Sequence, residues 1–233
     1  MMRRLAPKAR VCARVGALVG ALVGALVCTL TDARAMPFRV QAEFGLFEPG
    51  PEAPLGESGA RFLNDFGSVD RPKQATDPAF GLSLSVLPFE PLEVGLSARR
   101  LSTSLHYSVT GYPEVAQTQD TELTPIVAFV GLRGGSEWFE GHAAGGVGGT
   151  FARVSRRGYL DDGEANDLVL CGEVRVGGAF QLPAGLDLGL QLSWTALTLP
   201  STGPLFPIEP DDRGLHAVVL AITLGWQGPA ERP

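Results

Sequence analysis

The sequence predicts an all-β fold, an up-and-down antiparallel eight-stranded transmembrane β-barrel. Three observations lead to this prediction. Apolar and polar residues alternate along eight separate runs, long and short connections alternate between the runs, and the polar face of the runs carries little charge. The alternation alone fits a soluble sandwich as well as a membrane barrel, so the other two observations decide between them.

The first 35 residues have the pattern of a cleavable signal peptide. Basic side chains within residues 1–14 precede an uncharged stretch over residues 16–30, and Ala33 and Ala35 supply the small residues of a cleavage site. We therefore expect Sec export and cleavage between Ala35 and Met36. The uncharged stretch is shorter than the roughly 20 residues of a transmembrane helix, and an uncleaved anchor is the alternative.

Cleavage would leave one barrel domain, residues 36–227, and a short tail, residues 228–233. The full chain has a formal net charge of −6, and the chain after residue 35 has 13 basic and 24 acidic side chains, a net charge of −11. This acidity argues against nucleic acid as a partner, because nucleic-acid binding needs a basic surface. Cys171 is the only cysteine after residue 35, so we expect no internal disulfide and no cysteine-based metal site.

The period of two is clearest at residues 186–199, LDLGLQLSWTALTL, where Leu188, Leu190 and Leu192 alternate with Gly189 and Gln191. This is the period of a strand and not of a helix. In chain order, the predicted strands are residues 38–48, 79–87, 92–105, 121–133, 138–154, 167–182, 186–199 and 214–226. The register of 121–133 is ambiguous, because Pro125 and the apolar residues 126–130 break the alternation.

The connections between these strands alternate in length. Short connections such as PFEP, GGSE and PAG follow the second, fourth and sixth strands, and long polar ones follow the first, third, fifth and seventh. Every second connection of an up-and-down barrel lies at the same end, and outer-membrane barrels have short periplasmic turns and longer extracellular loops. The short turns and both ends of the domain are therefore expected on the periplasmic side.

Aromatic residues collect at the predicted strand ends, as expected for rings at the two membrane interfaces. The predicted interfacial set is Phe38, Phe89, Trp138, Phe180, Trp194 and Trp226. All of these except Trp194 map to the short-turn end; Trp194 belongs to a looser set at the other end, with Phe47, Tyr107 and Phe151. The alternative is that aromatic residues simply favour strands and hairpin ends.

The polar face of the strands is too sparsely charged for a surface in bulk water. Small residues dominate it, which suits the interior of an eight-stranded barrel. The predicted polar network inside the barrel comprises Arg39, Gln41, Glu43, Glu93, Arg99, Glu140, His142, Glu173, Arg175, Asp187 and Gln191. We expect ion pairs across the lumen, grouping Arg39 with Glu43, Glu93 with Arg99, and Glu173 with Arg175. A selectivity ring around a small pore is the alternative.

On these grounds the chain resembles the eight-stranded outer-membrane barrels of Gram-negative bacteria, the OmpA-like and OmpX-like transmembrane domains. The resemblance covers residues 38–226. In the last strand, alternate residues from His216 to Trp226 lie on one face, which is similar to the signal that family members present to the barrel-assembly machinery. The family usually ends at the aromatic residue, whereas QGPAERP follows Trp226 here.

No catalytic constellation is evident. The three histidines lie in different predicted strands or their flanks, and no serine, histidine and carboxylate are predicted at one height of the barrel. His142 could pair with Glu140. The glycines of residues 141–149 fit no phosphate-binding spacing, and DDGEAND at 161–167 lacks the spacing of a calcium loop, so no cofactor and no metal site is expected.

The sequence therefore predicts a small, non-catalytic barrel of the outer membrane with a structural or interaction role. The expected partners are outer-membrane lipid, lipopolysaccharide, the assembly machinery during biogenesis and an envelope protein complex. The alternatives are a narrow porin-like channel or small-ligand-binding barrel, and a soluble periplasmic barrel of lipocalin shape.

Overall fold

The computed structural model describes residues 37–49, 69–70, 77–110, 112–158, 163–198 and 214–228. The predicted signal peptide with its cleavage site, and the tail beyond residue 228, lie outside these residues.

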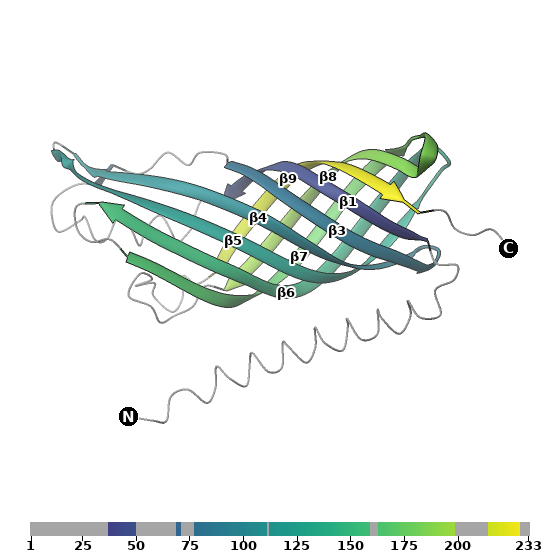
Figure 1. Ribbon diagram of the computed structural model, residues 1–233, viewed down its shortest axis with the longest axis horizontal. Helices are drawn as coiled ribbons and strands as arrows, with labels where there is room; N and C mark the ends of the chain where they lie inside the picture. The colour runs from purple at the N-terminus through teal and green to yellow at the C-terminus, as the bar shows by residue number, and fades with distance from the viewer. Residues whose placement is uncertain are drawn as a thin grey trace, which may run out of the picture.

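Eight long strands form one closed sheet (Figure 1). They are β1 (Phe38–Pro49), β3 (Asp77–Phe89), β4 (Leu92–Val109), β5 (Tyr112–Gly135), β6 (Phe139–Gly158), β7 (Gly163–Gln181), β8 (Leu186–Thr198) and β9 (Gly214–Gln227). A two-residue strand, β2 (Val69–Asp70), pairs with the end of β4, and a single 3-10 turn, η1 (Pro183–Gly185), joins β7 to β8.

The sheet closes because β1 pairs with both β3 and β9, while β4 pairs with both β3 and β5. Every pairing is antiparallel, and apart from β2 each strand lies beside its neighbours in the chain. Over the part of the barrel where all eight strands are paired, closure leaves none of them at an edge. The predicted fold, an eight-stranded up-and-down barrel, is confirmed.

Three tight turns and both ends of the described barrel lie at one end of the molecule (Figure 1). The amide of Gly228 donates a hydrogen bond to the carbonyl of Phe38 at 2.9 Å, which joins the two termini. In the β7–β8 turn, Gly185 has a φ of 74°, and a Cβ at this position would lie 2.5 Å from the carbonyl oxygen of Gln227. Only glycine fits this turn without strain.

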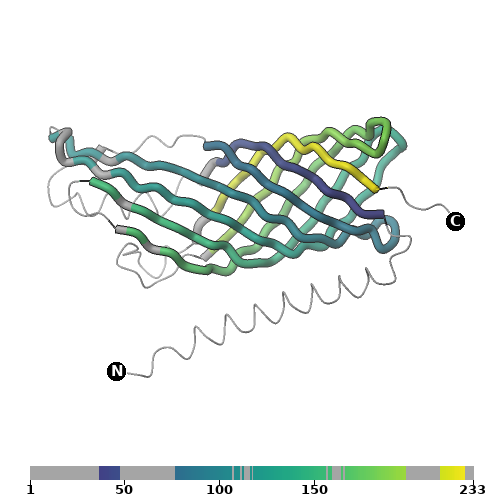
Figure 2. Tube along the Cα trace, in the orientation of Figure 1, coloured from purple at the N-terminus to yellow at the C-terminus, as the bar shows by residue number. Residues whose placement is uncertain are grey.

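At the opposite end, four strands are longer than the sequence predicts. Residues 106–109 belong to β4 and residues 112–120 to β5, where we expected a loop, and the fifth connection is shortened in the same way by β6 and β7. The paired strands therefore continue past the other four as a curved wall (Figures 1 and 2). We refer to this wall, residues 102–109, 112–122, 153–158 and 163–167, as the outer sheet.

The prediction failed here because the outward face of these strands changes from apolar to polar residues toward the outer end, so apolar residues no longer mark the outward face. In β4, Glu93 and Arg99 point into the barrel and Leu96 points out, but beyond Arg99 the inward residues are mostly apolar: Leu101, Leu105 and Val109, with Thr103 among them. A sheet surrounded by water needs an apolar interior, whereas a sheet surrounded by lipid needs an apolar exterior. On β4, the change from one pattern to the other lies between Arg99 and Arg100.

The structure also settles the register of residues 121–133. The inward residues include Leu123, Val127, Phe129 and Arg133, and Ala128 is buried as well. Phe47, which we expected at the outer interface, instead points into the barrel and is 1% exposed. It contributes to the apolar interior that the outer sheet requires, which the sequence does not reveal.

Candidate functional site

The barrel interior contains all eleven residues of the predicted polar network. Nine of them are buried, and Glu140 and His142 are partly buried. They form two groups of charged side chains, one at mid-height of the barrel and one near the tight turns. Above both groups the interior is mostly apolar, with Thr103, Gln119 and Thr121 as buried polar side chains.

Arg99 is the centre of the mid-height group. Its Nε lies 2.6 Å from Glu43 Oε2 and its Nη1 lies 2.7 Å from Glu173 Oε2. Arg175 lies 3.9 Å from Glu43 Oε1, and its guanidinium carbon sits 3.3 Å from the centre of the Phe129 ring. Two arginines thus balance two glutamates, as buried charges require.

The second group lies near the tight turns. Arg39 Nη2 contacts Asp187 Oδ1 at 2.5 Å, and Arg133 forms an ion pair with Glu140. Ser85 Oγ donates a hydrogen bond of 2.6 Å to Glu93. We did not predict Arg133 as a network residue, because the apolar residues 126–130 leave it undetermined which alternate residues of this strand face inward. A count in steps of two that includes Arg133 would have identified the inward face.

The expected groupings within the network were wrong. Arg39 pairs with Asp187 and not with Glu43, while Arg99 pairs with Glu43 and Glu173 and not with Glu93. Glu173 takes Arg99 as its close partner instead of Arg175. His142 Nε2 hydrogen-bonds to Gln191 Oε1 at 3.1 Å, while Glu140 accepts from Arg133 and Gln181. The partners come from other strands, because side chains on one face of a strand point in parallel and reach across a narrow lumen more easily than along the strand.

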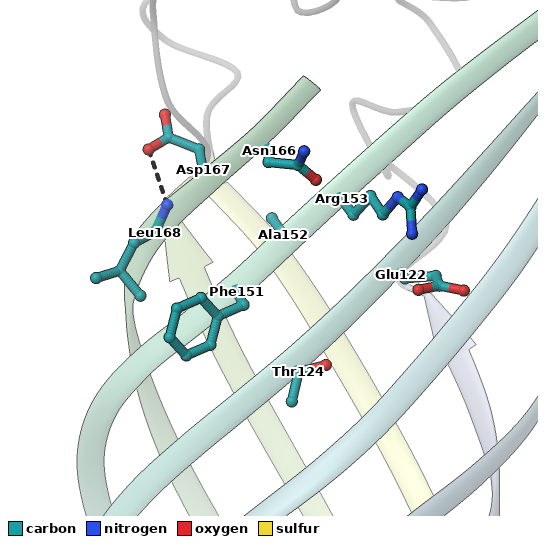
Figure 3. A pocket seen from close by; sticks show the side chains of 8 residues that line it. All are labelled: Glu122, Thr124, Phe151, Ala152, Arg153, Asn166, Asp167 and Leu168. Atoms are coloured by element: carbon teal, nitrogen blue, oxygen red, sulfur yellow. Dashed lines mark hydrogen bonds between the residues drawn. The ribbon is translucent and has the colours of Figure 1, made fainter. Parts of the chain in front are cut away.

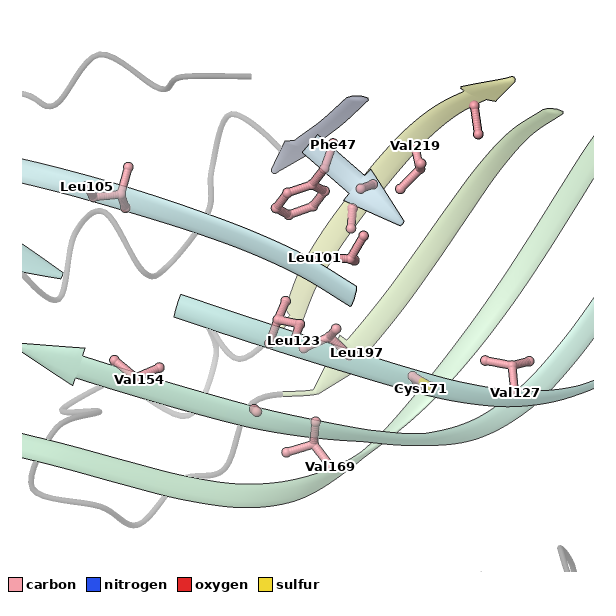
Figure 4. Close-up of a cluster of buried hydrophobic side chains, with 14 of the residues drawn as sticks. Phe47, Leu101, Leu105, Leu123, Val127, Val154, Val169, Cys171, Leu197 and Val219 are labelled. Atoms are coloured by element: carbon pink, nitrogen blue, oxygen red, sulfur yellow. The ribbon is translucent and has the colours of Figure 1, made fainter. Parts of the chain in front are cut away.

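An apolar core fills the barrel above the charges (Figure 4). Its largest members are Phe47, Leu101, Leu105, Leu123 and Leu197, each 3% exposed or less. These side chains come from four different strands, β1, β4, β5 and β8, and point into the barrel. Among the described residues, an ion entering from the outer end would have to pass this core before it reached Arg99.

The aromatic side chains of the predicted interfacial set all point outward. At the turn end, Phe38 and Trp226 make an edge contact at 5.4 Å, and Trp138 stacks on Phe180 at 6.0 Å between ring centres. Phe89 is also exposed at this end. Trp194 stands near the other end of β8 and stacks on His216 at 5.2 Å. Between these levels the outward side chains are almost all apolar.

A surface concavity of about 580 Å³ lies where this apolar band meets the outer sheet, on the outer face of β5, β6 and β7 (Figure 3). Arg153 and Glu164 form an ion pair of 2.9 Å beside it. The hydrogen bond from Arg153, supported by one from Asn166, lowers the pKa of Glu164, and the hydrogen bond with Glu164 raises the pKa of Arg153.

The lowered pKa of Glu164 gives a testable expectation. The ionised form is favoured in the folded barrel, so the contact with Arg153 persists above the ordinary pKa of a glutamate and is lost as the pH falls through the lowered value. We expect a carboxyl titration followed by NMR to have its midpoint below the ordinary range, and Arg153→Gln to move it upward. An unchanged midpoint in that variant would contradict the assignment.

Among the described residues, no cluster of three or more histidine, cysteine, aspartate or glutamate side chains is placed to hold a metal ion. No helix within the described part of the chain is long and apolar enough to cross a membrane.

The closed sheet and its outward apolar band define an eight-stranded barrel of outer-membrane type. No protein family matches the sequence, and no curated protein is similar to it in sequence. Several solved structures have a similar fold. Neisserial surface protein A is 11% identical with a TM-score of 0.48, over 82% of this chain and 96% of that one.

Two further similar structures are also outer-membrane proteins. OprG from Pseudomonas aeruginosa is 12% identical with a TM-score of 0.46, over 84% of this chain and 97% of that one. The outer membrane protease OmpT from Escherichia coli is 10% identical with a TM-score of 0.42, over 83% and 96%. At these identities the likeness concerns the fold, and the set includes an enzyme.

Proposed function

We propose that the chain is an integral barrel of the Gram-negative outer membrane that conducts no ions, catalyses no reaction and has a structural or interaction role. The observation that carries the proposal is the change of the outward face of β4 to β7 from apolar to polar residues, together with the mostly apolar interior of β4 beyond Arg99. Lipid surrounds the half with an apolar exterior, and water surrounds the half with an apolar interior. A soluble barrel would have an apolar interior throughout.

The apolar core supports the non-conducting part of the proposal. A pore needs a continuous polar path, whereas Phe47, Leu101 and Leu123 close the lumen above the charged groups. The charged side chains below neutralise each other and stabilise the barrel interior. The outer sheet is then the part that is free to meet a partner outside the cell, such as a component of an envelope complex.

The biogenesis that fits this proposal is Sec export followed by insertion through the barrel-assembly machinery. The last strand, β9, presents His216, Val218, Leu220, Ile222, Leu224 and Trp226 on its outer face. Lipid and lipopolysaccharide are the expected surroundings of the mature barrel.

Fractionation and conductance together test this function. We expect the full-length chain, expressed in a Gram-negative host, to stay in the outer membrane after a carbonate wash and to give a heat-modifiable band on SDS gels. The purified protein should be electrically silent in a planar bilayer. A conductance that changes on Glu173→Gln would show a channel instead, and release as a soluble protein would show a periplasmic barrel.

A further inference from the structure

The concavity on the outer face of β5, β6 and β7 lies at the boundary between the apolar band and the outer sheet (Figure 3). The strand register divides its outward side chains into two rows. In the upper row, Glu122 is opposite Arg153, which is opposite Asn166. In the lower row, Thr124 is opposite Phe151, which is opposite Leu168.

The two rows differ in what they can bind. The upper row offers a carboxylate, a guanidinium and an amide, which are planar groups that donate to and accept from hydroxyls. In the lower row, the Phe151 ring is 56% exposed and Leu168 is 43% exposed. A molecule that fills the concavity must therefore have a polar end above and an apolar end below, as an amphiphile has.

The outward face below the concavity is apolar. Below Phe151 the next residue of the outward face is Gly149, which lies between Ile126 and Leu170 on the neighbouring strands. Ile126 and Leu170 are exposed apolar side chains, so an acyl chain leaving the lower row would meet an apolar surface.

The charges around the concavity favour a hydroxyl-rich headgroup over a phosphate. Arg153 pairs with Glu164, and Arg100 pairs with Glu122, each at 2.9 Å, so both cations are already neutralised. Asp167 adds another carboxylate, which accepts a hydrogen bond from the amide of Leu168 at 2.8 Å. A free anion would meet more negative than positive charge here, whereas sugar hydroxyls can bind to carboxylates and amides without a net charge.

We propose that this concavity binds the headgroup of a glycolipid in the outer leaflet. The sugar hydroxyls contact Glu122, Arg153 and Asn166, and the first part of an acyl chain packs on Phe151 and Leu168. This inference rests on the proposed function, because it requires strands that cross the outer membrane.

Competitive lipid binding tests the proposal. The full-length barrel is purified in lauryldimethylamine oxide, a detergent without a sugar, and offered digalactosyl diacylglycerol, phosphatidylethanolamine and phosphatidylglycerol with identical acyl chains. Native mass spectrometry then measures which lipid each barrel retains. We expect retention of the glycolipid to exceed that of either phospholipid by about tenfold, the ratio produced by a few good contacts.

Two substitutions and one matched control locate the site. Phe151→Ala and Asn166→Ala should each reduce glycolipid retention by about tenfold. Phe80→Ala should leave glycolipid retention unchanged. The ring of Phe80 is comparably exposed (51%), but it lies on another strand, at the outer end of β3. Two variants are used so that the proposal can still be tested if one of them fails to fold.

Three outcomes would overturn the proposal: equal retention of all three lipids, a preference for phosphatidylglycerol, or an equal effect of Phe151→Ala and Phe80→Ala. A purified chain that gives no heat-modifiable band would instead contradict the outer-membrane function itself, and it would do so before any lipid is added. The two failures are therefore distinguishable.

Discussion

Replacing Arg99 with alanine is expected to lower the free energy of unfolding by about 3–5 kcal/mol, as found when one partner of a buried ion pair is removed. Arg99 contacts Glu43 and Glu173, and all three side chains are 2% exposed. Without Arg99, two carboxylates remain in the lumen with only Arg175 close by. Urea unfolding of the barrel in lipid vesicles, followed by tryptophan fluorescence, measures the change.

The adjacent residue provides the control. Arg100 pairs with Glu122 at 2.9 Å, but its side chain is 65% exposed, so Arg100→Ala should cost less than about 1 kcal/mol. Replacing Arg99 by leucine together with Glu173→Gln removes one charge of each sign and leaves Arg175 with Glu43, so it should restore most of the lost stability. If Arg99→Ala and Arg100→Ala had equal effects, the buried network would not stabilise the barrel.

Arginine in place of Ile222 is expected to destabilise the membrane-inserted barrel by about 2–4 kcal/mol, the cost of a charge on the lipid face at the bilayer midplane. Ile222 points outward, is 56% exposed, and lies midway along β9 between Trp226 and the level of His216. The substitution does not change the barrel interior, so the loss of stability depends only on what surrounds the outer face of the barrel at this position. Urea unfolding in vesicles of defined lipid measures it.

The same substitution nearer the interface is the matched comparison. Val218 lies on the same face of β9, one level below His216, and Val218→Arg should cost only about 0–1 kcal/mol. A barrel whose outer face meets water would tolerate arginine equally well at both positions. Equal and small effects would therefore contradict a lipid-facing exterior.

Much of this fold could be predicted from the sequence. In residues 186–199 the leucines alternate with small and polar residues, and the structure turns Leu188, Leu190 and Leu192 outward and Gln191 inward. The short connections also predict correctly which strands form tight hairpins. Period and turn composition are local properties, so a single sequence displays them.

Other features could not be predicted because they depend on what surrounds the strand. Leu105 and Val109 face inward while His106 faces outward, so these residues alternate as a strand does, but their polarity suggested a loop. Phe47 also lies in the apolar core, and its inward position likewise depends on the surroundings of the strand and not on the local sequence pattern. The partners of Arg99 lie on β1 and β7, and no local pattern specifies which carboxylates meet across the lumen.

The most direct test of the account is a spin-label scan of β8 in lipid vesicles. Single cysteines at residues 188–193, in a Cys171→Ser background, carry the label. We predict that labels at Leu188, Leu190 and Leu192 collide with dissolved oxygen and not with a water-soluble nickel complex, while labels at Gly189, Gln191 and Ser193 are shielded from both. Access of the nickel complex to the leucine positions would place the apolar face of β8 in water and contradict the account.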